Sequence, residues 1–493
     1  MITKFNYFTK ILVGSIFLLT LLYLYYNNNS LNFATRITLL SLYSLIFFSS
    51  LYELYKLKEN TYLPIFILSN IYFFLCYIAL FFFDREFIFP RFYDDDFETG
   101  IKVFCYGYLA FLIGSSISYN IFKKFNRNGF KFLSTTSNEI FIIGFFLLLL
   151  NLFFFELFDI NNYISGLAQI KYPLIAAGIG LLVEYLIDCK KDKKLFFKKF
   201  ISVVLIAITL FLFVLKSALS YPFMFVFLIY VYYSYRKKKI IIFPFIIIIF
   251  VFLFFHLGKY QFRDAVAINS QKTILYKIKD FINAQNFIIE NKDKLETGVT
   301  CKRFNSKDGI DCRITRTPQL QRRIFHSMDS LLIVTLLSPE TVPYWDGYTY
   351  NYLKSKIIPR ILWKNKPQDR LGNEFGHRYI KLTPAINKIT NKKQKKDIST
   401  SWNMPVLNEL YVNYGNKGVF YGMLIIGLLY SFIAKIFTVS SLKNIENPIA
   451  FFVFVPIFFL ESHASLVFGA VIQSYIFAMF SSFILLKILR KFN

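Results

Sequence analysis

The chain has 493 residues, of which 55% are apolar and only 18% are charged. Soluble domains average about 25% charged residues, so this composition excludes a single soluble domain and a disordered chain. The net charge of +27 does not indicate nucleic-acid binding, because Lys and Arg lie between apolar runs and in one large loop. Apolar runs of about 20 residues, enough to cross a bilayer as helices, predict an all-α polytopic membrane protein.

Twelve transmembrane helices are predicted along the chain. Their apolar cores are 9–26, 36–54, 62–83, 103–121, 138–159, 172–188, 200–216, 219–234, 240–257, 418–437, 447–461 and 465–487. The seventh and eighth are separated only by Lys216-Ser217, and a bent or re-entrant unit is the alternative there. The eleventh is short, so it is either tilted or crosses only part of the membrane.

The charge of the connections predicts the orientation of the chain. Every second connection is rich in Lys and Arg, most clearly 189–194 and 236–239, and the C-terminal end is basic as well. The intervening connections have few basic residues, and one of them contains Asp94-Asp95-Asp96. Because basic loops stay on the cytoplasmic side, both termini are predicted to be cytoplasmic.

One connection is much longer than the others. We divide the chain into 1–258 with nine helices, a large outer loop at 259–417, and 418–493 with three helices. The loop has 28 Lys and Arg residues against 14 Asp and Glu residues, so it is a cationic domain on the outer side. Within it, 270–290 and 319–337 are predicted helices that lie flat at the membrane interface.

The cysteines and the missing motifs limit the chemistry of the loop. Cys301 and Cys312 are eleven positions apart in a polar part of the loop, where an oxidising compartment favours a disulfide; two free thiols are the alternative. The sequence has no CxxC metal spacing and no GxxxxGK[ST] nucleotide motif. We therefore expect no metal site and no cofactor.

Charged residues within the predicted spans are few. Glu156, Glu184 and Lys216 lie near span ends, where long side chains commonly extend to the membrane surface. Glu461 belongs to Glu461-Ser462-His463 at an outer turn, close to where the loop must dock. For Glu461 a functional role and a surface role are equally favoured.

A cationic cluster lies late in the loop. Arg360, Lys364, Lys366 and Arg370 are close in sequence, and prolines at 359 and 367 restrict the backbone between them. Such a cluster suits a diphosphate, because Arg offers a planar fork for phosphoryl oxygens. The alternative is a basic segment that contacts anionic lipid headgroups.

Three further residues are candidates for the site. Glu409 lies at the start of the tenth span, where it acts as a base, binds an Arg, or only complements the helix dipole. His377 is a candidate proton shuttle, since His titrates near neutral pH; the alternative is that a lone histidine in a loop has no functional role. Arg323 precedes an apolar helix, and substrate binding and contact with the membrane surface are equally favoured for it.

The pattern GYTY…IPRILWKNKP…RLGNEFGHRY…TSWNMPVLNELYVNYGNKG resembles the large outer loop of Wzy-type O-antigen polymerases, the bacterial oligosaccharide repeat-unit polymerases. The similarity in sequence covers about 320–425, and the topology of the whole chain is similar to that of the family. The resemblance implies a GT-C-like glycosyltransferase of the bacterial inner membrane. It would join undecaprenyl-diphosphate-linked repeat units on the periplasmic face by inverting, metal-independent transfer, with a flippase and a chain-length regulator as partners.

The resemblance also implies roles for particular residues. The arginines that contact the diphosphate in the family map onto Arg360 and Arg370, with Lys366 and Arg323 as further substrate-binding residues. Its acidic residue maps onto Glu409, and Tyr411 and Asn413 lie in the same motif, where they are expected to bind substrate. Arg360, Glu409 and His377 are the expected catalytic residues.

Three other functions remain as alternatives, and one of them is a structural or assembly protein that binds polysaccharide. The related O-antigen ligases have a His just before an Asn at the end of the loop, whereas Trp402 precedes Asn403 here. This departure favours a polymerase over a ligase. A lipid-linked oligosaccharide flippase is less favoured, because it needs no large cationic outer domain and would be expected to show inverted repeats of spans.

Overall fold

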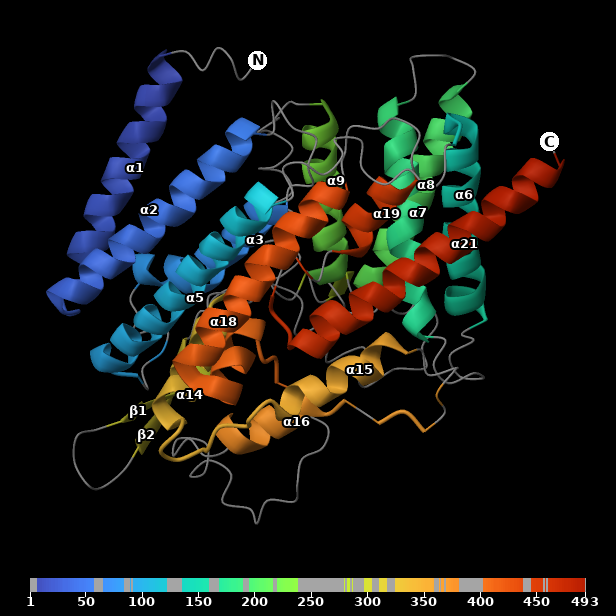
Figure 1. Ribbon diagram of the computed structural model, residues 1–493. Helices are drawn as coiled ribbons and strands as arrows, with labels where there is room; N and C mark the ends of the chain where they lie inside the picture. Colours follow the sequence, from blue (N-terminus) through green and yellow to red (C-terminus); the bar gives the residue numbers. More distant parts are fainter. Residues whose placement is uncertain are drawn as a thin grey trace.

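The protein is a bundle of long helices with a layer of shorter helices at one end (Figure 1). The computed structural model describes residues 7–56, 65–83, 89, 92–121, 135–158, 168–188, 195–215, 220–237, 279, 282–283, 286, 297–303, 310–316, 324–358, 363, 365–367, 369–380, 402–437, 445–454, 457 and 460–492. The first part of the bundle consists of α1 (Tyr7–Asn27), α2 (Phe33–Lys56), α3 (Ile65–Phe73) with η2 (Phe74–Ile78) and η3 (Ala79–Phe82), α5 (Asp94–Ile121), α6 (Ser137–Asn151) with η5 (Leu152–Leu157), α7 (Ala168–Asp188), α8 (Phe196–Leu215) and α9 (Ser220–Lys237).

The large loop and the end of the chain supply the other elements. The loop contains β1 (Thr297–Arg303), β2 (Ile310–Arg316), α14 (His326–Leu337), η9 (Tyr348–Tyr350), α15 (Asn351–Ile357), α16 (Leu371–Phe375) and η10 (Gly376–Ile380). The chain then forms α18 (Val406–Ile436), α19 (Glu446–Val453), η11 (Ser465–Gly469) and α21 (Ala470–Phe492). Of these elements, η2, η5, η10 and η11 are π-helices.

Seven of the described helices are long and apolar enough to cross a membrane: Phe33–Glu53, Asp94–Ser118, Ser137–Glu156, Ile170–Asp188, Phe196–Phe213, Val406–Ala434 and Ser465–Phe492. Shorter apolar helices are Gly14–Asn27, Phe66–Phe82 and His326–Leu337. The prediction of an all-α membrane protein is therefore confirmed in this coarse form, apart from one β-hairpin. The predicted ninth span, 240–257, lies outside the described residues.

The helices α5 and α18 form the most extensive helix–helix contact. A Cβ atom at Gly114 of α5 would overlap the carbonyl of Leu424, and one at Gly427 of α18 would overlap the carbonyl of Phe111. Glycine at both positions lets the two backbones touch, which is how small residues bring membrane helices together. This contact joins the N-terminal half of the bundle to the segment that follows the large loop.

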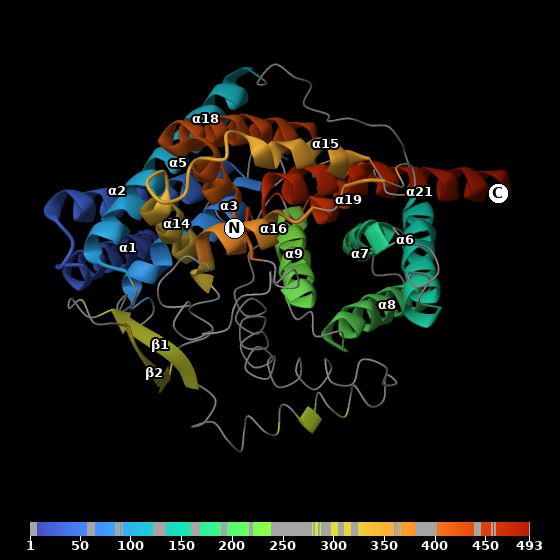
Figure 2. The same ribbon diagram turned by 90° about the horizontal axis from the view of Figure 1, so that it is seen from below.

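The loop elements and the chain ends lie at opposite ends of the bundle. In Figure 1, α1 begins and α21 ends in the upper part, whereas α15 and α16 cover the lower end. Seen from below, α15 lies beside α21 (Figure 2). The helices α15 and α16 of the large loop therefore pack on the end of the bundle that faces away from both termini.

The predicted helix at 319–337 is observed as α14, but the prediction that it lies flat at the interface is wrong. Ser327, Ser330 and their neighbours up to Val334 are buried. The Tyr72 hydroxyl lies 3.0 Å from the Ser327 hydroxyl, and the Asn408 amide donates to the Ser330 hydroxyl at 2.5 Å. Because its apolar residues surround the helix instead of forming one face, α14 packs inside the protein.

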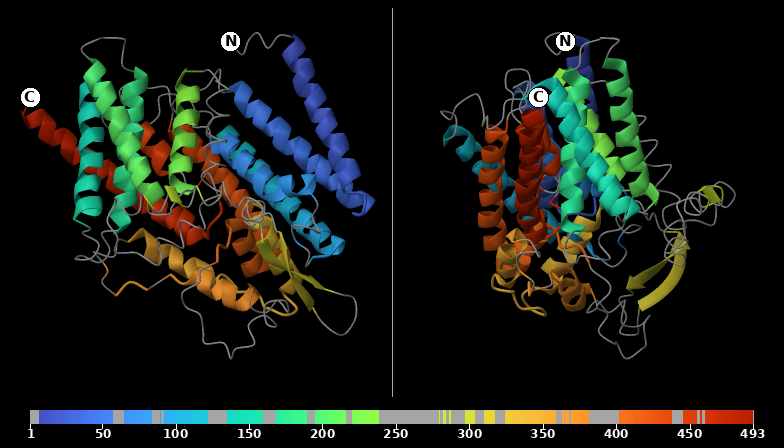
Figure 3. Two further views of the ribbon diagram at one scale, coloured as in Figure 1. Left: turned by 180° about the vertical axis from the view of Figure 1, so that it is seen from behind. Right: turned by 90° about the vertical axis from the view of Figure 1, so that its right-hand side faces the viewer.

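The hairpin formed by β1 and β2 was not predicted from the sequence. It stands away from the loop end of the bundle (Figure 3), and its two strands pair antiparallel with Cys301 opposite Cys312. Directly opposed residues in such a pair have Cα atoms about 4.5–5.5 Å apart. This spacing lies within the range that a disulfide spans.

We expect Cys301 and Cys312 to form a disulfide in the native membrane, since the register holds the two backbones at bridging distance. In non-reducing denaturant, a thiol-reactive polyethylene glycol should add to three cysteines, and after reduction to all five. The double variant Cys301→Ser/Cys312→Ser is the control and should show three additions with and without reductant. Five additions to the wild type before reduction would contradict the prediction.

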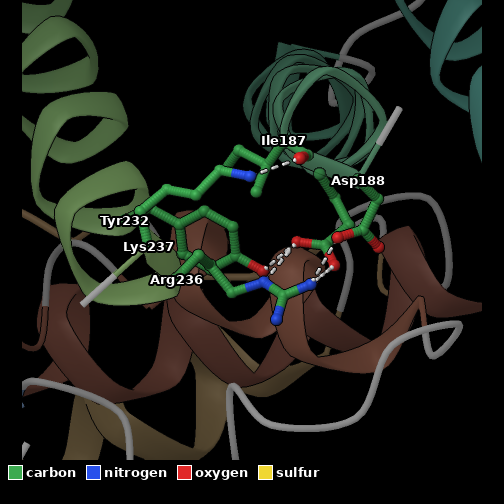
Figure 4. A network of polar contacts seen from close by, with 6 residues as sticks. Ile187, Asp188, Tyr232, Arg236 and Lys237 are labelled. Atoms are coloured by element: carbon green, nitrogen blue, oxygen red, sulfur yellow. Dashed lines mark hydrogen bonds and ion pairs between the residues drawn. The ribbon is translucent and has the colours of Figure 1, made fainter. Parts of the chain in front are cut away.

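A buried ion network fastens α9 to α7 at the bundle end opposite the loop (Figure 4). The Arg236 guanidinium forms ion pairs with Glu184 at 2.5 Å and with Asp188 at 2.9 Å. The Tyr232 hydroxyl donates to Glu184 at 2.7 Å, and Lys237 donates to the Ile187 carbonyl at 2.9 Å. Glu184 is therefore a buried partner of Arg236, and the interpretation that it extends to the membrane surface is wrong.

Candidate active site

The helix α18 consists of two parts joined by a sharp kink. Gly415 has φ +59° and ψ −146°, a conformation that only glycine adopts without strain. The first part folds back along the second: a Cβ atom at Gly418 would overlap the Leu410 carbonyl, and one at Gly422 would overlap the Leu410 side chain. We call residues 404–413 the re-entrant segment.

Protein surrounds the re-entrant segment on all sides. Each residue from 404 to 413 is buried. Leu407 lies against Gly107 of α5, beside Val419 and Met423 of the second part of α18. At 1.5 Å per residue, its helical residues 406–413 extend about 10 Å from the kink. Irregular backbone at membrane depth is tolerated only where protein encloses it or where it lines a cavity.

This arrangement differs from the predicted start of the tenth span at 418, because α18 begins at Val406. Asn408, Glu409 and Asn413 interrupt the apolar pattern, so the sequence is typical of a loop in water. In the structure the partners of these polar groups are other protein groups.

Glu409 is fully buried, and the turn at 460–464 binds it. Its Oε2 atom accepts a hydrogen bond from the Ala464 backbone N–H at 2.5 Å, whereas its Oε1 atom has no hydrogen-bond partner in the described structure. The Val406 N–H donates to the Leu460 carbonyl at 3.1 Å, and the Asn403 amide donates to Glu461 at 3.2 Å. The end of the large loop is thereby tied to the turn before η11.

Asp369 is the second buried carboxylate at this place. Its Oδ2 atom lies 2.9 Å from His463 Nε2 and accepts a hydrogen bond from the Ser465 hydroxyl at 2.8 Å. The Lys356 ammonium lies 3.4 Å from the same oxygen, and the Leu371 N–H donates to Oδ1 at 3.2 Å. Burial disfavours the charged form, but the hydrogen bond and charge of His463, together with Lys356, outweigh it and hold the pKa of Asp369 well below its usual range.

A third group of polar residues lies at the kink end of the re-entrant segment. The Asn413 amide donates to the Thr349 hydroxyl at 2.9 Å and to the Glu409 carbonyl at 2.7 Å. Burial, followed by the charge of nearby Glu409, raises the pKa of the Tyr350 phenol above its usual value. Asn413, which was predicted to bind substrate, therefore has a structural role, since its side chain joins η9 to the re-entrant segment.

The other predicted site residues occupy different environments. Arg370 is exposed and follows Asp369 directly, whereas Lys366 is buried and its ammonium donates to the Ile358 carbonyl at 2.7 Å. His377 is half-buried in η10, and Tyr411 packs edge-on against the ring of Tyr344. Arg360 and Arg323 lie outside the described residues.

Asp369 and His463 were not predicted as site residues. In the sequence, the turn that contains His463 stands out only because of the carboxylate of Glu461. Asp369 gives no local signal in the sequence, because its partner His463 is 94 positions away. The contact between Asp369 and His463 forms only where the loop packs on the bundle, so the structure is needed to identify it.

Comparison with known proteins does not assign the chain to a family. No protein-family model, curated protein or solved structure matches the chain. Its function is therefore inferred from its own residues and their arrangement.

Proposed function

We propose that the protein polymerises undecaprenyl-diphosphate-linked oligosaccharide repeat units on the outer face of a bacterial inner membrane. In this transfer a sugar hydroxyl of one repeat unit attacks the anomeric carbon of another, and the lipid diphosphate leaves. The main support is that Glu409 and the Asp369–His463 pair meet at one turn, where the cationic loop docks on the bundle. Polar groups at a membrane–water boundary suit a substrate that has a lipid tail and a sugar head.

The proposed topology has twelve spans, a GT-C-like arrangement and both termini in the cytoplasm. It is supported by the basic connections on alternate sides and by the position of α1 and α21, whose chain ends face away from the loop (Figure 1). In this orientation the large loop is periplasmic. A flippase would deliver the repeat units, and a chain-length regulator would set the length of the polymer.

The proposed chemistry uses no metal and no cofactor, as the family resemblance implies. Arg360 and Arg370 would stabilise the charge that develops on the leaving diphosphate, with Arg323 and Lys366 binding the same group. Exposed Arg370 next to buried Asp369 supports a diphosphate position at the rim of the site. The sequence leaves Glu409 and His377 as candidates for the base that takes the proton of the acceptor hydroxyl, and the family resemblance places Tyr411 and Asn413 at the sugar.

Deletion of the gene in the source bacterium tests this proposal, with surface glycolipids resolved on gels and carrier-linked sugars analysed. If the ladder of polymer lengths on the gel is replaced by lipid A core that carries a single repeat unit, the result would support a polymerase. Bare core with long polymer still on the carrier would instead indicate a ligase. An unchanged profile would contradict the proposed function and favour a structural role.

A lipid-linked oligosaccharide flippase is the second candidate, and one structural observation favours it. Two non-spanning elements, the re-entrant segment and the turn at 460–464, meet through the Val406–Leu460 hydrogen bond. Transporters commonly build their binding sites from discontinuous helices. In the deletion strain, repeat units trapped on the cytoplasmic face would identify a flippase.

Substitution of Arg360 tests the role of the cationic cluster. We expect Arg360→Lys to lower the rate of polymer formation by about 100-fold or more, because an ammonium retains the charge but cannot form two parallel hydrogen bonds to a diphosphate. The measurement is the incorporation of labelled repeat units into polymer, normalised to the amount of protein in the membrane. Arg303→Lys, in β1 and outside the cluster, serves as the control and should retain activity; near-normal polymerisation by Arg360→Lys would remove Arg360 from the site.

A further inference from the structure

The turn between α19 and η11 holds a histidine whose ring is fixed by a carboxylate from the large loop. His463 Nε2 lies 2.9 Å from Asp369 Oδ2, and the side chains of the two residues are 7% and 5% exposed. Ser465 donates a hydrogen bond to the same Asp369 oxygen at 2.8 Å. We infer that His463, oriented by Asp369, is the general base of the transfer; this inference rests on the proposed function.

The hydrogen bond determines which ring nitrogen can act. An ionised carboxylate only accepts hydrogen bonds, so His463 Nε2 carries the proton and Nδ1 presents its lone pair. Asp369 is ionised at neutral pH, since His463, Lys356 and the Ser465 hydroxyl keep its pKa well below the usual range despite its burial. A carboxylate orients a histidine base in serine hydrolases in a similar way, with the roles of the two ring nitrogens exchanged.

Glu409 is less suited to this task than His463. It is fully buried, and its Oε2 atom is occupied by the Ala464 N–H, so it holds the turn that positions His463. Glu409 is therefore a positioning residue in this scheme.

The reaction balances with these groups. The acceptor hydroxyl oxygen forms the new bond to the anomeric carbon, while its proton passes to His463 Nδ1. The bond between that carbon and the phosphate oxygen breaks, and its electron pair leaves with the lipid diphosphate. Arg370, which the proposed function assigns to the leaving diphosphate, follows Asp369 directly in the chain, and His463 later releases the proton to water.

The charge environment of His463 comes from four elements. Asp369 belongs to the segment before α16, Lys356 to α15, Glu409 to the re-entrant segment, and Glu461 to the same turn as His463. The wild-type rate should fall as the outer pH is lowered, because a protonated imidazole cannot accept another proton.

The test uses spheroplasts of the deletion strain, each expressing one variant. The substrate is the carrier-linked repeat unit that the strain itself makes, and the outer pH is set between about 5.5 and 8. His463→Gln should polymerise about 100-fold or more slowly, a typical contribution of a general base. Its residual rate should no longer depend on pH in this range. Asp369→Asn, which preserves the shape of the side chain, should show a similar loss. His326→Gln is the matched control at another histidine of the loop and should retain the wild-type rate and pH profile.

Two outcomes separate this inference from the proposed function. If deletion leaves the polymer unchanged, the proposed function fails. If deletion abolishes the polymer but His463→Gln keeps the wild-type rate or pH profile at normal membrane abundance, only the role of His463 is overturned. Where His463→Gln does not accumulate in the membrane, Asp369→Asn decides: normal abundance with a wild-type rate contradicts the inference.

Discussion

Replacing Gly415 with alanine should release the re-entrant segment from its buried position. Gly415 has φ +59°, and a Cβ atom there would come within 2.6 Å of the Tyr344 hydroxyl. Such a backbone conformation costs a residue other than glycine about 1–3 kcal/mol. This cost predicts about 5- to 150-fold faster amide hydrogen exchange in residues 404–413, measured by mass spectrometry on the purified protein in detergent.

Gly14→Ala is the matched control for this experiment. A Cβ atom at Gly14 meets no atom within 4 Å, so exchange in residues 404–413 should stay at the wild-type rate. If Gly415→Ala also leaves that rate unchanged, the kink does not depend on glycine. The two-part structure of α18 would then have to be revised.

Removing Arg236 should destabilise the protein at the bundle end opposite the loop. Arg236→Met leaves Glu184 and Asp188 without their cation, and the Glu184 side chain is only 3% exposed. Breaking a buried pair in this way typically costs about 3–5 kcal/mol, since an uncompensated charge stays behind. We expect a clearly lower midpoint of thermal unfolding in detergent.

Lys491→Met is the control for the loss of one positive charge, because Lys491 is exposed at the end of α21. It should unfold at the wild-type midpoint, as most exposed substitutions do. A second comparison uses Arg236→Met with Glu184→Leu, which removes one of the two orphaned carboxylates and should recover part of the loss. Equal midpoints for Arg236→Met and wild type would mean that the ion network does not stabilise the bundle.

The coarse fold is predictable because apolar length is a local property of the sequence. Long apolar runs specify helices such as α5 and α21 without any knowledge of their neighbours. The burial of α14 and of the re-entrant segment is not predictable in this way. Their polar residues, including Ser330 and Asn408, have partners on other elements, and a window along the chain contains no information about such partners.

The site was predictable only in part, for a similar reason. Glu409 could be singled out because a carboxylate at the start of an apolar run is unusual. The bond from Ala464 to Glu409 joins residues 55 positions apart, and the bond between Asp369 and His463 spans 94 positions. In the sequence, Asp369 is one of many polar residues in the loop, and only its contact with the turn at 460–464 distinguishes it.

The bonds from the re-entrant segment to the turn at 460–464 also impose an order on biogenesis. When residues 404–413 leave the ribosome, the turn that will bind Glu409 has not yet been synthesised. A segment with Asn408, Glu409 and Asn413 is too polar to rest in lipid alone, so its final burial must follow the synthesis of this turn. The site therefore forms last, and a chain interrupted before Leu460 would insert most of its helices without ever assembling it.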